Sequence, residues 1–312
     1  MDPYLTEPGV FNILSVPTGP IGAVTGDPHN PTHIYLGGSE GLYHSIDGGA
    51  TWTVLSRELR YPHVLLVDPF DSQQLYAARR DLTSFLPLPG IYRSVDGGVT
   101  WKPCTTGLGA ERIFALTLDP GHAGVLYAGS WAGRVYKSVD GGETWFLATP
   151  APIRGSPQEA AGTVGQLLVN PVDGALYALE AYAGTFRSTD GGLNWRHVHA
   201  DGGWLAIDPR EGTLYLAGRR LQRSADGGQT WAEISAGLPY DPQRGGYATY
   251  WIGVHPDPLV LCTRYHRSRD GGVSWQPLEA PASFIPRALL PGKQLTLYGS
   301  LNGQAGRYQE AS

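Results

Sequence analysis

The sequence predicts an all-β protein, a β-propeller of seven four-stranded antiparallel blades. Three observations lead to this prediction. The octapeptide Ser-x-Asp-Gly-Gly-x-(Thr/Asn/Ser)-Trp occurs six times, with its Asp at positions 47, 96, 140, 190, 226 and 270. Each copy lies among short runs rich in aromatic and β-branched residues and bounded by Gly, Pro, Asn or Asp, which is typical of strands. No segment keeps a helical period over the length that a helix needs.

The spacing of the octapeptide points to repeated blades. Successive Asp residues are 49, 44, 50, 36 and 44 residues apart, a period typical of solenoids, propellers and arrays. Each unit contains four apolar runs. The first ends in a turn such as Asp68-Pro69, the second carries a Tyr such as Tyr76, the third leads into the octapeptide and the fourth follows it. Four antiparallel strands in each repeat, without helices, form a propeller blade.

The two ends of the chain supply the seventh blade. Three further strand-like runs follow the sixth unit, at 283–290, 294–299 and 306–308, and they lack the octapeptide. The missing outer strand is available in 10–16. Pairing the two ends would close the ring and remove its exposed edges. We therefore expect seven blades, with six as the alternative, in a single domain over residues 1–312.

The octapeptide itself has the chemistry of a hairpin turn. Its two Gly residues can adopt positive φ without steric cost, and its Asp can accept hydrogen bonds from the backbone of its own turn. Its Trp offers a large apolar face that can seal the outer strands of a blade. A catalytic carboxylate is needed once, whereas a turn is needed in every blade. We therefore interpret the six Asp residues as structural.

Composition limits the classes of function. The net charge of −5 gives no reason to expect nucleic-acid binding. No apolar run approaches the roughly 18 residues of a membrane span. Residues 1–8 lack the basic and apolar regions of a secretion signal, so we expect a cytoplasmic protein. Cys104 and Cys262 are too few for a disulfide framework and lack metal-binding spacing, so we expect no metal and no cofactor. We also expect a monomer.

Residues that break the repeat mark a candidate binding face. Connections between blades and loops between second and third strands share one face of a propeller, which we call the funnel face. Three of the nine Trp residues lie outside the octapeptides, namely Trp131, Trp204 and Trp251, and all three map to this face. They could contact a ligand or plug the central channel. The loops at 79–90, 150–162 and 237–249 exceed what a blade needs, and long loops on a rigid scaffold often carry function.

Several Arg and Tyr residues map to the same face. Arg binds carboxylate, phosphate or sulfate groups through two hydrogen bonds, and neighbouring aromatic rings would suit a sugar. Alternatively, these Arg residues pair with carboxylates around the rim. The candidate ligand-binding residues are Arg79, Arg112, Trp131, Tyr182, Trp204, Arg219, Tyr250, Trp251, Arg264 and Arg287.

The octapeptide resembles the Asp-box, also called the BNR repeat, and the resemblance covers six of the seven units. Asp-box propellers include sialidases, xyloglucan-active endoglucanases, sortilin-type receptors and photosystem II assembly factors. The chain is nearest in size to the assembly factors, which are single seven-bladed propellers. Sialidases carry an Arg-Ile-Pro type motif before the first Asp-box, whereas residues 1–44 of this chain contain no Arg. In these families the Asp-box lies away from the substrate face.

These observations favour a non-catalytic binding or assembly scaffold. The predicted ligand is a protein segment or an anionic or carbohydrate small molecule held on the funnel face. The alternative is a glycoside hydrolase or lyase acting on an acidic sugar, with Glu111, Asp81 and Glu180 as candidate acid/base groups. Whether the protein is an enzyme stays open. Glycoside hydrolysis requires two carboxyl groups about 5–5.5 Å or about 6.5–9.5 Å apart, which a structure can test.

Overall fold

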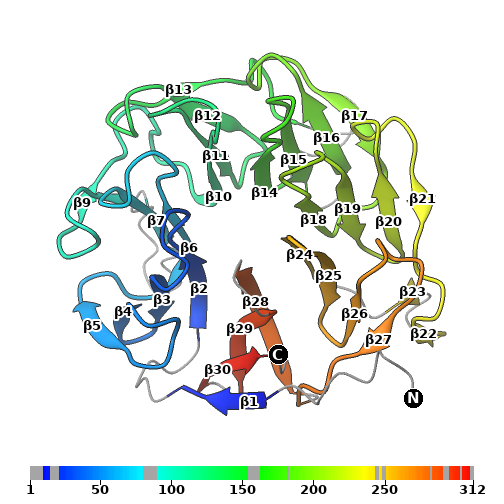
Figure 1. Ribbon diagram of the computed structural model, residues 1–312. Helices are drawn as coiled ribbons and strands as arrows, with labels where there is room; N and C mark the ends of the chain where they lie inside the picture. The colour runs from blue at the N-terminus through cyan, green and yellow to red at the C-terminus, as the bar shows by residue number, and fades with distance from the viewer. Residues whose placement is uncertain are drawn as a thin grey trace.

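The strands form a ring of seven blades around a central axis (Figure 1). The computed structural model describes residues 10–14, 21–79, 90–153, 162–180, 183–242, 246–247, 251–281, 283–290, 295–302 and 304–309. Seven sheets have four antiparallel strands each, which confirms the predicted seven-bladed propeller and rules out six blades.

The first four blades follow the chain in order, and each runs from its innermost to its outermost strand. Blade 1 contains β2 (Ile21–Gly26), β3 (Ile34–Gly38), β4 (Gly41–Ser45) and β5 (Thr53–Ser56). Blade 2 contains β6 (Pro62–Val67), β7 (Leu75–Arg79), β8 (Ile91–Ser94) and β9 (Lys102–Pro103). Blade 3 contains β10 (Ile113–Leu118), β11 (Leu126–Ser130), β12 (Val135–Ser138) and β13 (Phe146–Leu147). Blade 4 contains β14 (Val164–Val169), β15 (Leu176–Glu180), β16 (Gly184–Ser188) and β17 (Arg196–His199).

The last three blades include the one shared by both ends of the chain. Blade 5 contains β18 (Trp204–Ile207), β19 (Leu214–Ala217), β20 (Leu221–Ser224) and β21 (Ala232–Glu233). A separate hairpin of β22 (Tyr240–Asp241) and β23 (Gly246–Tyr247) lies in the predicted long loop before blade 6. Blade 6 contains β24 (Ile252–Pro256), β25 (Leu259–Thr263), β26 (His266–Ser268) and β27 (Gln276–Pro277). Blade 7 contains β28 (Phe284–Leu290), β29 (Thr296–Leu301), β30 (Gln304–Gln309) and β1 (Val10–Ile13).

The ring closes as the sequence predicts. The N-terminal strand β1 pairs antiparallel with β30, in a register that places Val10 opposite Gln309 and Ile13 opposite Gly306. The hydrophobic clusters lie between blades rather than within them. One cluster, for example, joins Tyr35 and Leu42 of blade 1 to Leu65 and Leu75 of blade 2. Because each blade buries its faces against its two neighbours, the closed ring leaves no blade with an uncovered face.

The Asp-box forms the turn between the third and fourth strands, as predicted. In blade 1, the Ser45 hydroxyl donates to Asp47 at 2.8 Å and accepts the backbone N–H of Gly49 at 2.7 Å. The same carboxylate accepts the Thr51 backbone N–H at 2.8 Å and the Thr51 hydroxyl at 2.5 Å. Gly48 and Gly49 have φ of 70° and 83°, values that side-chain-bearing residues rarely adopt. Both carboxylate oxygens therefore serve the turn.

These hydrogen bonds predict acid sensitivity. The Thr51 hydroxyl and backbone N–H, with smaller help from Ser45, lower the pKa of Asp47 to about 2, and Thr100 does the same for Asp96. The pKa of a free Asp carboxyl is near 3.9. A carboxyl whose pKa is lower in the folded than in the unfolded protein stabilises the fold at pH values above the unfolded pKa. The contribution is lost as pH falls towards about 2. We expect the urea midpoint to drop over this interval, and to drop less in an Asp96→Asn variant. A midpoint constant between about pH 4 and 2 would contradict this expectation.

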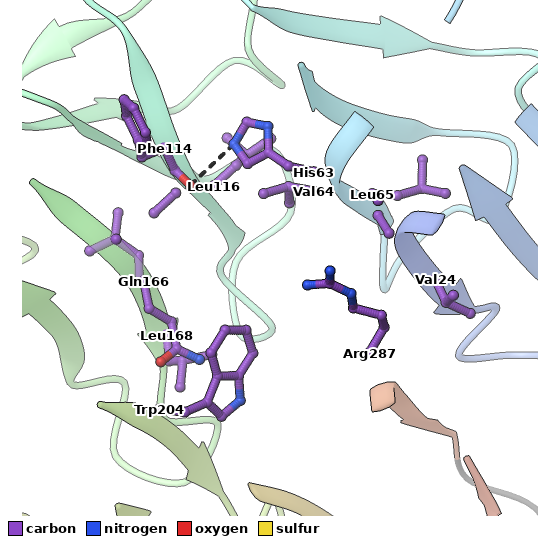
Figure 2. Close-up of a pocket in the computed structure, with 15 residues that line it drawn as sticks. Val24, His63, Val64, Leu65, Phe114, Leu116, Gln166, Leu168, Trp204 and Arg287 are labelled. Carbon is purple, nitrogen blue, oxygen red and sulfur yellow. Dashed lines mark hydrogen bonds between the residues drawn. The ribbon is translucent and has the colours of Figure 1, made fainter. Parts of the chain in front are cut away.

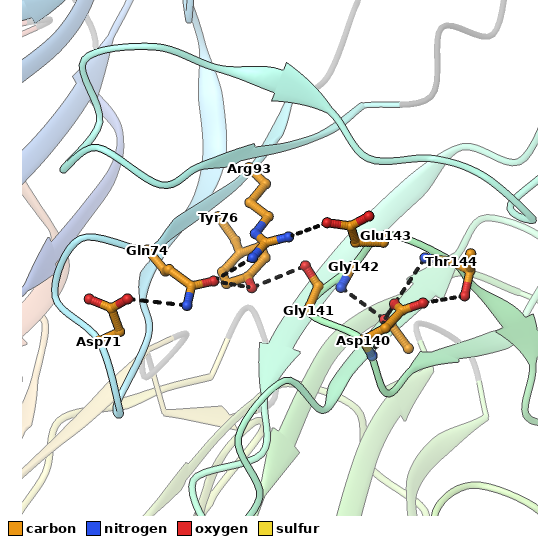
Figure 3. Close-up of polar contacts among 10 residues, drawn as sticks. Asp71, Gln74, Tyr76, Arg93, Asp140, Gly141, Gly142, Glu143 and Thr144 are labelled. Atoms are coloured by element: carbon orange, nitrogen blue, oxygen red, sulfur yellow. Dashed lines mark hydrogen bonds and ion pairs between the residues drawn. The ribbon is translucent and has the colours of Figure 1, made fainter.

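The Asp-box turns also fasten neighbouring blades to each other. Figure 3 shows the contact between blades 2 and 3, where the hydroxyl of Tyr76 donates to the carbonyl of Gly141 at 3.1 Å. Arg93, the cross-strand partner of Tyr76, donates to Glu143 at 3.0 Å and to Gln74 at 2.7 Å. The second-strand Tyr76 therefore connects its blade to the Asp-box of the next blade.

The same contact joins the first and last blades. Tyr298 of β29 and Arg307 of β30 both donate to the carbonyl of Gly48, each at 2.9 Å. Residues near the C-terminal end of the chain thus bind the first Asp-box directly. Blade 7 lacks an Asp-box of its own, but it presents the Tyr and Arg that hold its neighbour's. The ring is closed by this contact as well as by strand pairing.

The Asp-box Trp residues make two kinds of hydrogen bond. In blades 1, 2 and 4 the indole N–H donates to the turn's own Gly, as Trp101 does to Gly98 at 2.9 Å. In blades 3, 5 and 6 it donates to a carbonyl of the preceding blade, as Trp145 does to Cys104 at 2.9 Å. The Trp thus seals the junction between blades as well as its own blade.

Candidate functional site

The innermost strands of five blades carry a β-bulge near their first residue. The register shifts between Ile21 and Ala23, Pro62 and Val64, Ile113 and Ala115, Val164 and Gln166, and Pro286 and Ala288. The residues left unpaired by these shifts are Gly22, His63, Phe114, Gly165 and Arg287. A bulge re-aims a side chain away from the regular alternation of a strand. All five bulge residues line one cavity at the centre of the ring.

This central cavity has a volume of about 340 Å³ and is lined by the inner strands β2, β6, β10, β14, β18 and β28. Much of its wall is aliphatic, including Val64, Leu116 and Leu168. Within the part of the chain that the structure describes, no Asp or Glu lines it. Gly165 adds open space, because a Cβ built there would meet no atom within 4 Å. The cavity wall therefore combines aliphatic side chains with polar groups, among them His63, Gln166 and Arg287.

Arg287 is the cation of the cavity. Figure 2 shows its side chain extending from β28 into the open space, with Trp204 of β18 entering from another side. No ion pair joins Arg287 to a carboxylate among the residues whose placement is described. A guanidinium can grip a planar oxyanion through two parallel hydrogen bonds. Arg287 is itself exposed, and an Arg without a carboxylate partner beside aliphatic side chains is a candidate anion site.

Two other polar side chains of the cavity are engaged with the backbone. Both ends of the Gln166 amide bind Leu205, one donating to its carbonyl and one accepting its N–H, each at 2.9 Å. This pair of hydrogen bonds ties the inner strands of blades 4 and 5 together. The Nε2 of His63 lies 3.2 Å from the Phe114 carbonyl, which requires that this nitrogen carry the proton. These groups shape the wall around Arg287.

Aromatic rings lead from the cavity towards the funnel face. The ring centroids of His63 and Phe114 are 6.5 Å apart, and those of Phe114 and Trp131 are 5.5 Å apart with a tilt of 44°. Trp131 stands in the turn between β11 and β12 and is 59% exposed. Trp204, on the other side of the cavity, is 38% exposed. Trp131 and Trp204, two of the three predicted Trp residues, are thus accessible to a ligand.

The structure gives the other predicted Arg residues varied surroundings. The guanidinium of Arg79 lies 5.6 Å from the Tyr92 ring, and that of Arg264 lies 4.8 Å from Tyr265. Arg264 also donates to the carbonyl of Phe284 at 3.1 Å. The exposed residues Arg112 and Arg219 each provide a backbone carbonyl to a neighbouring loop. None of these four lines the central cavity as Arg287 does.

The predicted acid/base residues have structural partners. Glu111 pairs with Arg134 at 2.9 Å at the rim of blade 3. Glu180 is 1% exposed, and its carboxylate accepts the backbone N–H of Ala183. Asp81 lies outside the described residues, as do the predicted ligand-binding residues Tyr182 and Tyr250. Trp251 packs against the hydrophobic cluster between blades 6 and 7. No pair of unengaged carboxylates therefore meets at the cavity in the described part.

Sequence reasoning missed the bulge as a feature and with it Phe114 and Gln166. A signal does exist, because in the first four units the bulge residue stands five positions before the turn residue. The pairs are Gly22 and Asp27, His63 and Asp68, Phe114 and Asp119, and Gly165 and Asn170. The side chains at this position vary, whereas the position two residues later is always aliphatic, as Val24, Leu65, Leu116 and Leu167.

Two further site classes receive no support from the described residues. No group of three or more His, Cys, Asp or Glu residues among them could hold a metal ion. They also include no helix with the length and apolar character to traverse a lipid bilayer.

Comparisons with known proteins identify the architecture. No family model matches the chain, and no curated protein matches it. An ancestral GH74 enzyme is 17% identical with a TM-score of 0.68, and the match covers 94% of this chain but 45% of that one. YCF48 bound to D1 peptide is 19% identical with a TM-score of 0.65, and the match covers 98% and 97% of the two chains. Catalytically inactive virginiamycin B lyase from Staphylococcus aureus, with quinupristin, is 14% identical with a TM-score of 0.68, covering 96% and 99%.

These likenesses establish the fold. The chain spans less than half of the GH74 enzyme, whereas it matches YCF48 over nearly the full length of both. The predicted resemblance to Asp-box propellers, nearest in size to the photosystem II assembly factors, is therefore confirmed for the architecture. At such identities the residues of the cavity must be interpreted on their own chemistry.

Proposed function

We propose that this protein is a binding scaffold whose central cavity receives an anionic group of a protein segment. The observation that carries the proposal is Arg287, a cation without a carboxylate partner among the described residues, in a cavity whose wall includes several aliphatic side chains. A charge-assisted hydrogen bond contributes about 1.5–3 kcal/mol, and a bound segment that covers the exposed Arg287 would strengthen it by displacing water. The likeness to a peptide-bound propeller of the same length is consistent with this use of the ring.

The polar groups of the cavity favour an apolar segment with an acid over an acidic sugar. A sugar ring carries several hydroxyls, and each must find a hydrogen-bonding partner when it leaves water. Gln166 uses both ends of its amide on Leu205, and the Nε2 of His63 is used by Phe114. Arg287 can satisfy a carboxylate, whereas aliphatic side chains such as Leu116 and Leu168 offer hydroxyls no hydrogen-bonding partner. The carboxylates expected of a glycosidase are likewise engaged elsewhere, in the cases of Glu111 and Glu180.

The test uses Arg287→Gln and a matched control, Arg196→Gln, on the exposed outer strand of blade 4. Random linear peptides displayed on phage would be selected on immobilised wild-type protein, and the affinities of the enriched peptides measured by fluorescence anisotropy. We expect acidic peptides to be enriched. Arg287→Gln should weaken their binding about tenfold or more, because it removes a charge-assisted bond, while Arg196→Gln should leave it unchanged.

A second variant tests the cavity by reducing its open volume. Gly165→Leu would place a side chain into open space without a backbone clash, so the fold should be preserved. It should weaken the same peptides, whereas Gly165→Ala should have a small effect. Equal binding by wild type, Arg287→Gln and Gly165→Leu would exclude the cavity as the binding site.

A further inference from the structure

We infer that Trp131 and Phe114 form a second contact site, which binds an aromatic or large aliphatic side chain of the same segment whose acidic group reaches Arg287. This inference rests on the proposed function and adds a requirement for a second residue in the ligand. The two rings form a continuous surface that starts in the cavity and ends on the funnel face.

The first observation is the exposure of Trp131 on a fixed backbone. Its side chain is 59% exposed, although its ring lies 5.5 Å from Phe114 and its backbone N–H is fixed by the Arg112 carbonyl at 2.9 Å. The following turn is also anchored, because the Ser130 hydroxyl accepts the backbone N–H groups of Ala132 and Arg134. Trp131 is therefore held on a rigid base with much of its indole surface in water.

The second observation is continuity with the cavity. Phe114 is a bulge residue, so its ring belongs both to the cavity wall and to the contact with Trp131. A ligand that enters the cavity beside Phe114 must pass this surface. Large aromatic side chains, Trp above all, are among the residues that contribute most to binding when a partner buries them.

The third observation is charge complementarity with one kind of occupant. Arg112 is exposed beside Trp131, whereas the nearby Arg134 is neutralised by Glu111 at 2.9 Å. Arg112 is thus next to Trp131 and Arg287 lines the cavity beyond Phe114, and neither forms an ion pair with a carboxylate among the described residues. This arrangement fits an extended peptide that combines acidic residues with a large apolar one. A polyhydroxylated chain would find fewer hydrogen-bonding partners along it.

The experiment repeats the peptide selection with Trp131→Ala. The control is Phe146→Ala, which removes a ring of similar exposure, 49%, from the outer strand of the same blade. Both side chains are on the surface, so both variants should fold, which circular dichroism can verify. We expect wild type and Phe146→Ala to enrich peptides with an acidic residue and a large apolar residue at a fixed spacing. Trp131→Ala should lose the apolar preference and bind the wild-type peptides about tenfold more weakly.

The outcomes separate this inference from the proposed function. If Arg287→Gln abolishes the acidic preference while Trp131→Ala selects the same peptides as wild type, the binding scaffold stands and the second contact site is wrong. If neither variant changes the selected peptides, both proposals are wrong. If uronic-acid oligosaccharides bind while no peptides are enriched, a carbohydrate site replaces both.

Discussion

Replacing Trp145 by Ala is expected to lower the free energy of unfolding by about 3–5 kcal/mol, the usual effect of deleting a large buried aromatic ring. Trp145 is 4% exposed and packs in the cluster that joins blades 2 and 3. Its indole N–H also binds the Cys104 carbonyl of the preceding blade. The substitution therefore opens a cavity and leaves a buried carbonyl without its donor, and the two effects add.

The reactivity of the two cysteine thiols can show where in the ring the Trp145→Ala substitution loosens the packing. Burial raises the pKa of Cys104 and Cys262 to about 12, so neither should react with a thiol reagent in the native wild-type protein. In Trp145→Ala, Cys104 should become reactive, while Cys262 in blade 6 stays protected. Trp101→Ala is the matched control, because that half-buried ring bonds to its own turn and should cost less. Equal destabilisation by the two variants would contradict the role of Trp145 between blades.

Gly49→Ala is expected to destabilise the protein by about 2–5 kcal/mol, as the sum of backbone strain and overpacking. Gly49 has φ of 83°, where a side chain strains the backbone, and a Cβ there would lie 2.4 Å from the hydroxyl oxygen of Tyr298. Tyr298 is fully buried and bonded to the Gly48 carbonyl, so it cannot move aside easily. The clash falls on the contact that closes the ring between blades 7 and 1.

The adjacent Gly48 provides the control. It has φ of 70°, but a Cβ there would meet no atom within 4 Å, so Gly48→Ala should cost only the strain of about 1–2 kcal/mol. Urea unfolding of both variants measures the difference. Adding Tyr298→Phe should recover part of the loss in Gly49→Ala, because it removes the clashing oxygen. If both Gly→Ala variants lose the same free energy of unfolding, or if Tyr298→Phe restores none of it in Gly49→Ala, the contact between blades 7 and 1 accommodates the methyl group.

Much of the fold could be predicted because each blade repeats the same short sequence pattern. The Asp-box determines one turn in six blades, and its six copies identify the period that no single segment would reveal. The seventh blade could be inferred from the strand pattern at 10–16 and 283–308, because an open ring would leave strand edges exposed. The connection from Tyr76 to the next blade's Asp-box was not predicted, since a pattern of strands does not say which neighbour a side chain reaches.

The candidate site was predictable only in part. Trp204 and Arg287 were found because they break the repeat on the funnel face, and both line the cavity. Glu180 and Trp251 also break the repeat. However, Glu180 accepts a hydrogen bond from Ala183 in its own turn, and Trp251 packs against the hydrophobic cluster between blades 6 and 7. The sequence pattern assigns a residue to one face of the propeller, but whether its side chain points into the cavity depends on the β-bulge. Phe114 was missed because a bulge shifts the strand alternation by one residue.

The pairing of β1 with β30 has a consequence for how the chain folds. Val10 and Gln309 are partners across almost the whole length of the sequence, whereas the other strands of a blade pair with near neighbours. A chain growing from its N-terminus can assemble six blades before the partner of β1 exists, so the closing strand must wait until β30 has been synthesised. Loop-closure entropy grows slowly, by only about 0.6 kcal/mol for each doubling of length. The final pairing is thus delayed in time while its thermodynamic penalty stays small, and the last step of folding converts an open array into a ring.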